Sequence, residues 1–228
     1  MIELVALDMA GTTIEEHGDV YVALHDAVAA EGARPTDALV QRWMGTDKRE
    51  AIAALAAAGG GPALDGDGVE RAYARFRGLL ADRYRARPPV PIAGVPEALA
   101  ALRAAGVRVA LTTGFARDVV DPLLASLGWE VGGPLVEAVV CADDVPAGRP
   151  APYMVFRAME RTGVRSVERV LVAGDTVADL RAGTNAGAGI VVGVATGALG
   201  PAELGAERHT HLLPSVADIP ALLAALDV

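Results

Sequence analysis

Hydrophobic and polar positions divide this chain into segments of different periodicity. Leu4-Val5-Ala6-Leu7 is a short apolar run, which is typical of a buried strand in a parallel sheet. From Thr13 to Val107 the apolar positions instead recur at helical spacing, and we expect no strand there. This stretch contains a stiff connector, Pro88-Pro89-Val90-Pro91. Helices are predicted over residues 20–31, 36–44, 48–58, 69–85 and 95–105.

Beyond this stretch, short apolar runs alternate with helical stripes. Strands are predicted over 107–112, 138–141, 170–173 and 190–194, and helices over 117–127, 153–161 and 177–186. Alternating strands and helices form βαβ units, so we expect an α/β fold with a doubly wound parallel sheet. The site of such a fold lies beyond the carboxyl ends of its strands. We predict a core of residues 1–15 and 89–228 and an inserted α-helical cap domain, residues 16–88, over the site.

Composition narrows the classes of ligand. The chain has 228 residues, enough for one full core and a small second domain, and a net charge of -9. This charge argues against nucleic-acid and anionic membrane surfaces, which are bound by clustered Lys and Arg, and favours a small-molecule ligand. The single Cys141 excludes an internal disulfide. The start Met1-Ile2-Glu3 lacks a signal-peptide pattern and no apolar run reaches membrane-spanning length, so we expect a cytoplasmic protein.

Four short polar strings follow the predicted strands. They are Asp8-Met9-Ala10-Gly11-Thr12, Thr113-Gly114, Gly148-Arg149-Pro150 and Gly174-Asp175-Thr176-Val177-Ala178-Asp179. A parallel sheet brings its carboxyl ends to one edge, so a carboxylate, a hydroxyl, a cation and a carboxylate pair should meet there. Taken singly, each of these residues is more often a turn, cap or surface residue. Together and in this order they predict a phosphoryl-transfer site.

Each group has a predicted role at that site. Asp8 is the nucleophile, and Arg149 grips phosphate oxygens through its planar fork. A magnesium ion would take Asp8, the backbone carbonyl of Ala10 and Asp175. Asp179, one helical turn after Asp175, could be a further ligand or could orient a metal-bound water.

The loop residues beside these groups are predicted to bind phosphate. Gly11 permits a sharp turn that aims backbone amides at the phosphate, and Thr12 and Thr13 brace the turn. Thr113 offers a hydroxyl from the next strand end, followed by Gly114. Other conspicuous side chains are interpreted structurally: Cys141 as a buried strand residue, Trp43, Trp129 and Phe156 as packing, His25 as structural, and His209 and His211 as part of a surface strand.

The four strings resemble the motifs of the haloacid dehalogenase superfamily. The resemblance implies a Rossmann-like core, a mobile cap inserted after the first motif and a magnesium-assisted aspartyl nucleophile. Within the superfamily the chain is most similar to the phosphonatases, that is, the phosphonoacetaldehyde hydrolases and their relatives. This closer similarity rests on Asp8-Met9-Ala10-Gly11-Thr12-Thr13, Met44-Gly45-Thr46-Asp47-Lys48, Thr112-Thr113-Gly114, Asp143-Asp144-Val145-Pro146-Ala147-Gly148-Arg149-Pro150 and Gly174-Asp175-Thr176-Val177.

Two departures from the general superfamily pattern also favour the phosphonatases. The usual second aspartate of the first motif is replaced by Ala10, and the usual lysine of the third motif is replaced by Arg149. In related phosphatases the second aspartate protonates the leaving alkoxide, and general acid help is worth about 10²- to 10⁴-fold. In a phosphonate the leaving group is a carbon atom, which needs an electron sink in place of a proton on oxygen. Lys48 could supply that sink as a Schiff base with the substrate carbonyl. The alternative is a phosphomonoesterase in which Lys48 only binds an acidic small metabolite.

The surroundings of Lys48 do not decide its pKa. Asp47 as N-cap places Lys48 in the first turn of a helix, where the macrodipole, like burial under a closed cap, lowers the pKa. The charges of Asp47 and Glu50 raise it. These effects oppose each other, so the sequence leaves open whether the pKa of Lys48 is raised or lowered.

The chain also departs from the phosphonatase pattern itself. Where that pattern has a histidine, this chain has Ala51, and where it has a tyrosine, this chain has Phe115. The cysteine of that pattern is missing, and its place falls near Asp19. A 2-oxoalkylphosphonate related to phosphonoacetaldehyde therefore fits better than phosphonoacetaldehyde itself. Phosphonatases pair through their caps, and Ala-rich helices could build the same homodimer here.

Overall fold

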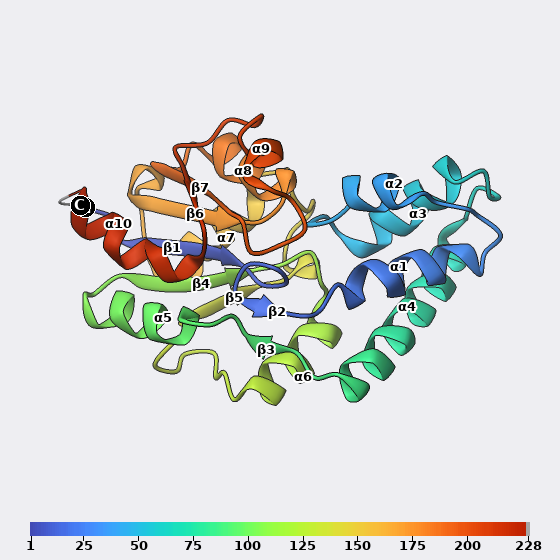
Figure 1. Ribbon diagram of the computed structural model, residues 1–228, viewed down its shortest axis with the longest axis horizontal. Helices are drawn as coiled ribbons and strands as arrows, with labels where there is room; N and C mark the ends of the chain where they lie inside the picture. Colours follow the sequence, from blue (N-terminus) through green and yellow to red (C-terminus); the bar gives the residue numbers. More distant parts are fainter. Residues whose placement is uncertain (227–228) are drawn as a thin grey trace. The chain divides into compact units, whose positions relative to one another are not determined.

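The computed structural model describes residues 1–226 and divides into two compact units. One unit comprises Met1–Glu15 and Val90–Val228, and the other comprises Glu16–Pro89. Figure 1 shows the helices and strands of each unit.

The first unit is built on a six-stranded sheet in which every neighbouring pair is parallel. The strand order is β5-β4-β1-β6-β7-β8, so β1 lies inside the sheet between β4 and β6. Every residue of β1, β6 and β7 is buried, as expected for strands covered on both faces. The bounds are β1 Leu4–Asp8, β4 Arg108–Thr112, β5 Ala138–Val140, β6 Val170–Gly174, β7 Ile190–Val194 and β8 His211–Leu213.

Helices connect and cover these strands. α7 packs on β4, β5 and β1, and one apolar cluster joins its Met154, Val155 and Ala158 to the strand residues Leu4 and Val172. α8 packs on β6 and β7, and α5 on β4. The helices are α5 Val95–Ala104, α6 Arg117–Leu127, α7 Tyr153–Thr162, α8 Val177–Ala186, α9 Pro201–Leu204 and α10 Ile219–Ala225, with 3₁₀ turns at Ala142–Asp144, Val167–Arg169 and Val216–Asp218.

A short second sheet corrects one expectation from the sequence. β2 (Ile14–Glu15) pairs antiparallel with β3 (Val90–Pro91), so the stretch between Thr13 and Val107 does contain strands. The proline-rich segment that we interpreted as a stiff connector supplies one of them. Strands of two residues leave no alternating pattern to detect, and Pro91 lacks the amide that a longer ladder requires.

The second unit contains four helices, α1 Asp19–Ala29, α2 Asp37–Arg42, α3 Lys48–Ala58 and α4 Gly66–Ala86. α1 and α4 pack against each other, and α3 packs on both. Their facing sides bury Leu24, Leu55 and Phe76 completely. Arg83 of α4 pairs with Asp19 of α1 at 3.1 Å.

The predicted fold class, a doubly wound α/β core with an inserted helical region, is confirmed. Cys141 is buried just after β5, and His211 begins β8 as expected, whereas His209 lies before the strand and not in it. Phe156 was wrongly expected to pack inside, because 39% of it is exposed on α7. Among residues 1–226, no helix is both long enough and apolar enough to cross a membrane.

Candidate active site

Three buried carboxylates gather at the carboxyl edge of the main sheet. Asp8 is the last residue of β1, Asp175 follows β6, and Asp179 lies in the first turn of α8. Each offers an oxygen, and these oxygens all lie within 4.8 Å of one another. Because β1 and β6 are neighbours in register, the fold itself brings two of the carboxylates together.

Arg149 joins this group from the segment after β5. It is 3% exposed, lies 2.6 Å from Asp8 Oδ1 through Nη2, and forms a second ion pair with Asp179. Within residues 1–226 its guanidinium nitrogens make ion pairs but no hydrogen bond of regular geometry. Buried donors without aligned acceptors fit a site that receives an anion such as a phosphoryl group.

The turn after Asp8 differs from our expectation in what its amides do. The amide of Gly11 donates to Ile14 O at 2.9 Å, and that of Thr12 donates to Met9 O at 3.2 Å. Both amides therefore bond within the turn instead of aiming outward. The Thr12 hydroxyl donates to Asp175 Oδ1 at 2.7 Å, and the Thr13 hydroxyl donates to Asp8 O at 3.0 Å, so the predicted bracing is observed.

Gly11 is required by both conformation and space. Its φ is +84°, in the left-handed region that side chains disfavour. A Cβ there would also lie 2.6 Å from Asp175 Oδ2. The glycine thus allows the turn to approach the acidic group closely.

Thr113 lies at the end of the neighbouring strand, as predicted. Its Oγ1 accepts a hydrogen bond from Phe115 N at 3.1 Å, and its amide donates to Val140 O at 3.0 Å. As an acceptor in this bond, the hydroxyl keeps its own hydrogen to donate. Thr113 and the adjacent Gly114 remain our predicted contacts to a phosphate.

The electrostatics of the acidic group fit a divalent cation. Burial raises the pKa of Asp175 from its ordinary value of 3.8 to about 7, and the charge of Asp8 is the second cause of this rise. The hydrogen bond from Thr12 and the charge of Arg149 lower the pKa, but by less. Three carboxylates and one guanidinium carry two excess negative charges when all are ionised. Oxygen donors and two excess charges match what Mg²⁺ requires.

Asp179 has partners at both of its oxygens. Oδ2 accepts from Thr176 N at 3.1 Å in a capping box at the start of α8, and Oδ1 pairs with Arg149. These contacts favour the second of the two roles left open above, in which Asp179 would orient a metal-bound water. They also anchor Arg149.

The raised pKa of Asp175 predicts a pH dependence of stability in the metal-free protein. Between about pH 4 and pH 7 the folded state keeps a proton on Asp175 that the unfolded state has lost, so stability falls as pH rises through this window. The loss is at most about 4 kcal/mol, at about 1.36 kcal/mol per pKa unit. Urea midpoints measured with chelator across this range should show the decline, and Asp175→Asn should flatten it.

The exposed carboxylate Glu130 provides a matched control for this measurement. Glu130→Gln should keep the slope of the parent protein. A parent and an Asp175→Asn variant with equal slopes would contradict the assignment.

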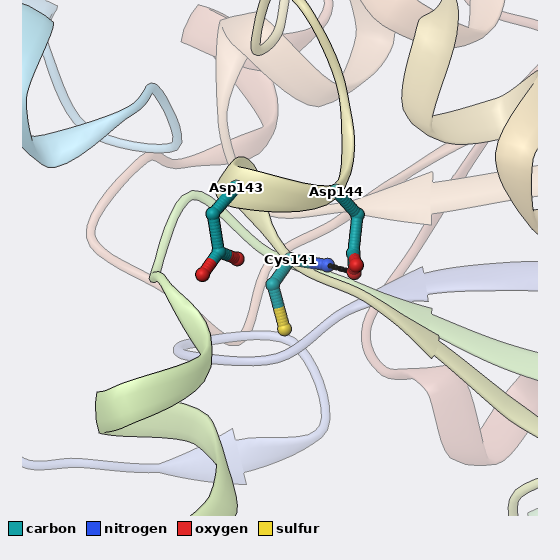
Figure 2. Close-up of side chains that lie close together, drawn as sticks. All are labelled: Cys141, Asp143 and Asp144. Atoms are coloured by element: carbon teal, nitrogen blue, oxygen red, sulfur yellow. Dashed lines mark hydrogen bonds between the residues drawn. The ribbon is translucent and has the colours of Figure 1, made fainter.

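A second cluster follows β5 and consists of Cys141, Asp143 and Asp144 (Figure 2). Burial raises the pKa of the Cys141 thiol to about 12, which disfavours the thiolate that binds metals. Asp144 accepts from Cys141 N at 2.8 Å, from Arg117 at 2.8 Å and from Arg161 at 2.7 Å. Burial raises the pKa of Asp144, but these contacts outweigh it and the pKa is lowered. The cluster thus fastens the segment that leads to Arg149.

Lys48 is in the second unit, where Asp47 caps α3 as predicted by accepting from Arg49 N and Glu50 N. Lys48 is 3% exposed, and its Nζ donates to Thr46 O at 3.0 Å. The predicted Schiff-base lysine is thus a buried amine in the first turn of a helix.

Two residues that no sequence pattern singled out, Thr196 and Gly197, lie on the loop after β7. The Thr196 hydroxyl donates to Gly11 O at 2.6 Å, and Gly197 lies directly against Asp175. The sequence holds a related signal, because Thr196-Gly197 comes two residues after the end of β7 and Thr113-Gly114 comes directly after β4.

Comparison with known proteins identifies the family of this chain. The sequence matches the haloacid dehalogenase-like hydrolases over residues 2–187, and the chain belongs to that family. More particularly, it is 30% identical to a phosphonoacetaldehyde hydrolase of Bacillus cereus over 226 residues, an alignment that covers 90% of this chain and 81% of that protein.

The chain is also similar to two further proteins named as a phosphonoacetaldehyde hydrolase or as like one. A phosphonoacetaldehyde hydrolase of Parabacteroides distasonis is 41% identical over 106 residues, which span 45% of this chain and only 39% of that protein. The crystal structure of a phosphonoacetaldehyde hydrolase-like protein from Oleispira antarctica superposes with a TM-score of 0.81 at 24% identity, covering 99% of this chain and 92% of that one. At that identity the superposition supports the fold.

Proposed function

We propose that this chain is a phosphonatase-like hydrolase that cleaves the carbon-phosphorus bond of a 2-oxoalkylphosphonate. The single observation that carries the proposal is the combination of a buried Lys48 amine with Ala10 at the place of the general acid. The similarity to phosphonoacetaldehyde hydrolases supports the same substrate class.

In this proposal Asp8 attacks phosphorus and Arg149 holds the phosphoryl oxygens. Its 2.6 Å contact with Asp8 supports this role, because one planar fork can orient the nucleophile and the anion together. The hydroxyl of Thr113 donates to a phosphoryl oxygen. A divalent ion held by Asp8, the Ala10 carbonyl and Asp175 would neutralise the charge on these oxygens.

Lys48 acts on the carbon arm of the substrate. Its amine condenses with the carbonyl group, releases water and forms an iminium. Asp8 then forms a bond to phosphorus while the carbon-phosphorus bond breaks, and the bonding electrons move into the enamine. Protonation of the enamine carbon and hydrolysis of the imine restore the Lys48 amine. Water releases phosphate from Asp8.

A phosphate-release assay tests the proposal directly. In the presence of Mg²⁺, 2-oxoalkylphosphonates should be hydrolysed at least about 10²-fold more efficiently than sugar or nucleotide phosphates, because without an acid at position 10 ester cleavage lacks a proton donor. Excess chelator should abolish this activity. Preference for phosphate esters, or full release in chelator, would contradict the proposal.

The second candidate is a phosphomonoesterase acting on a small phosphorylated metabolite. The hydrogen bond from Lys48 Nζ to Thr46 O is compatible with it, since a charged lysine that only binds an anion also donates to a carbonyl. Ala10 disfavours it, because nothing at that position can protonate an alkoxide. The same assay distinguishes the two candidates.

A further inference from the structure

The loop after β7 contacts the candidate metal group at two points. Thr196 is half-buried, and its hydroxyl donates to Gly11 O at 2.6 Å, a bond between residues 185 positions apart in the chain. Gly197 follows, and a Cβ at this position would overlap the carboxylate of Asp175. The loop therefore touches both the turn after Asp8 and the second metal-site carboxylate.

We propose that Thr196 and Gly197 are positioning residues that hold the Gly11 turn and Asp175 in the arrangement that binds a divalent cation. This inference rests on the proposed function, because it assigns a role toward the metal site postulated there. Neither residue belongs to the motifs on which the family resemblance is based.

The bond from Thr196 fixes Gly11 on its carbonyl side. On the other side, the Gly11 amide donates to Ile14 O at 2.9 Å. Because a trans peptide is planar, the direction of the Gly11 N–H also fixes the direction of the Ala10 carbonyl, which is the proposed backbone ligand. Gly11 thus has both of its peptide groups held, one by the turn and one by Thr196.

Gly197 acts on the carboxylate. Asp175 is confined between Gly11 and Gly197, with the Thr12 hydroxyl bonded to Oδ1 at 2.7 Å. Two glycines are the reason that a carboxylate fits in this space. A methyl group at position 197 must displace Asp175, because Asp175 occupies the volume that the methyl would take.

Direct binding of Mn²⁺ to the full chain, followed by electron paramagnetic resonance, tests this role without turnover. Mn²⁺ takes the same oxygen ligands as Mg²⁺. Thr196→Val keeps the side-chain shape but removes the donor, and it should weaken Mn²⁺ binding roughly 3- to 10-fold. Thr196→Ser should restore binding to within about 2-fold. Gly197→Ala should weaken binding by more than about 10-fold.

Thr210→Val is the matched control, since the Thr210 hydroxyl also donates to a backbone carbonyl, that of Val191, at 2.9 Å and at the opposite end of β7. It should lower the unfolding midpoint without weakening Mn²⁺ binding. Parent-like Mn²⁺ affinity in both Thr196→Val and Gly197→Ala would overturn the inference.

Asp175→Ala separates this failure from failure of the proposed function. If Asp175→Ala loses Mn²⁺ while the two loop variants bind like the parent, the metal site stands and the role of the loop is wrong. If Asp175→Ala itself binds Mn²⁺ like the parent, the metal site and the inference fall together.

Discussion

Replacement of Lys48 by alanine should abolish cleavage of a 2-oxoalkylphosphonate, lowering kcat by more than about 10³-fold. The reason is chemical, since without the amine no iminium forms and the electrons of the breaking carbon-phosphorus bond have no acceptor. Lys48 is buried at the start of α3, so the substitution removes a functional group and little surface charge. Steady-state phosphate release measures the effect.

Two controls isolate the amine from the charge. Lys48→Arg keeps a cation but cannot form an imine at neutral pH, and it should be as inactive as Lys48→Ala. Both variants should still accept a phosphoryl group on Asp8 from a small acyl phosphate, because that step needs no electron sink. A Lys48→Arg variant that still cleaves the phosphonate would contradict the imine mechanism.

Asp8→Asn should remove phosphate release from every substrate, by more than about 10⁴-fold, because an amide is not a phosphoryl acceptor. The variant should still condense substrate with Lys48. Borohydride should therefore reduce the imine in Asp8→Asn to an adduct that retains phosphorus, which mass spectrometry detects.

The exposed Asp121 offers a matched carboxylate-to-amide control within the same unit. Asp121→Asn should keep the activity of the parent. Retained phosphate release in a folded Asp8→Asn variant would exclude this residue as the nucleophile.

The parts of the fold that could be predicted are those with a sustained pattern. Buried parallel strands give uninterrupted apolar runs, and the polar strings at their ends met as expected because β1 and β6 are neighbours. The N-cap Asp47 likewise gave the start of α3 correctly. Local signals of this kind do not depend on distant parts of the chain.

The contacts that escaped prediction depend on distance in sequence. Thr196 reaches Gly11 through the loop after β7, and β6 separates β7 from β1 in the sheet, so no pattern local to Thr196 shows this contact. The pairing of β2 with β3 also joins segments on either side of the insertion. The acceptors of the Gly11 and Thr12 amides also escaped prediction, because they depend on the detailed path of the chain through the turn.

The central claim is that Lys48 forms a covalent imine with the substrate. The most direct measurement adds borohydride to the parent protein during turnover of a 2-oxoalkylphosphonate and locates the adduct by mass spectrometry of the digested chain. If the imine forms, the protein should be inactivated and a single reduced carbon adduct should be found on the Lys48 peptide, absent in Lys48→Arg. Continued turnover with no adduct at Lys48 would contradict it.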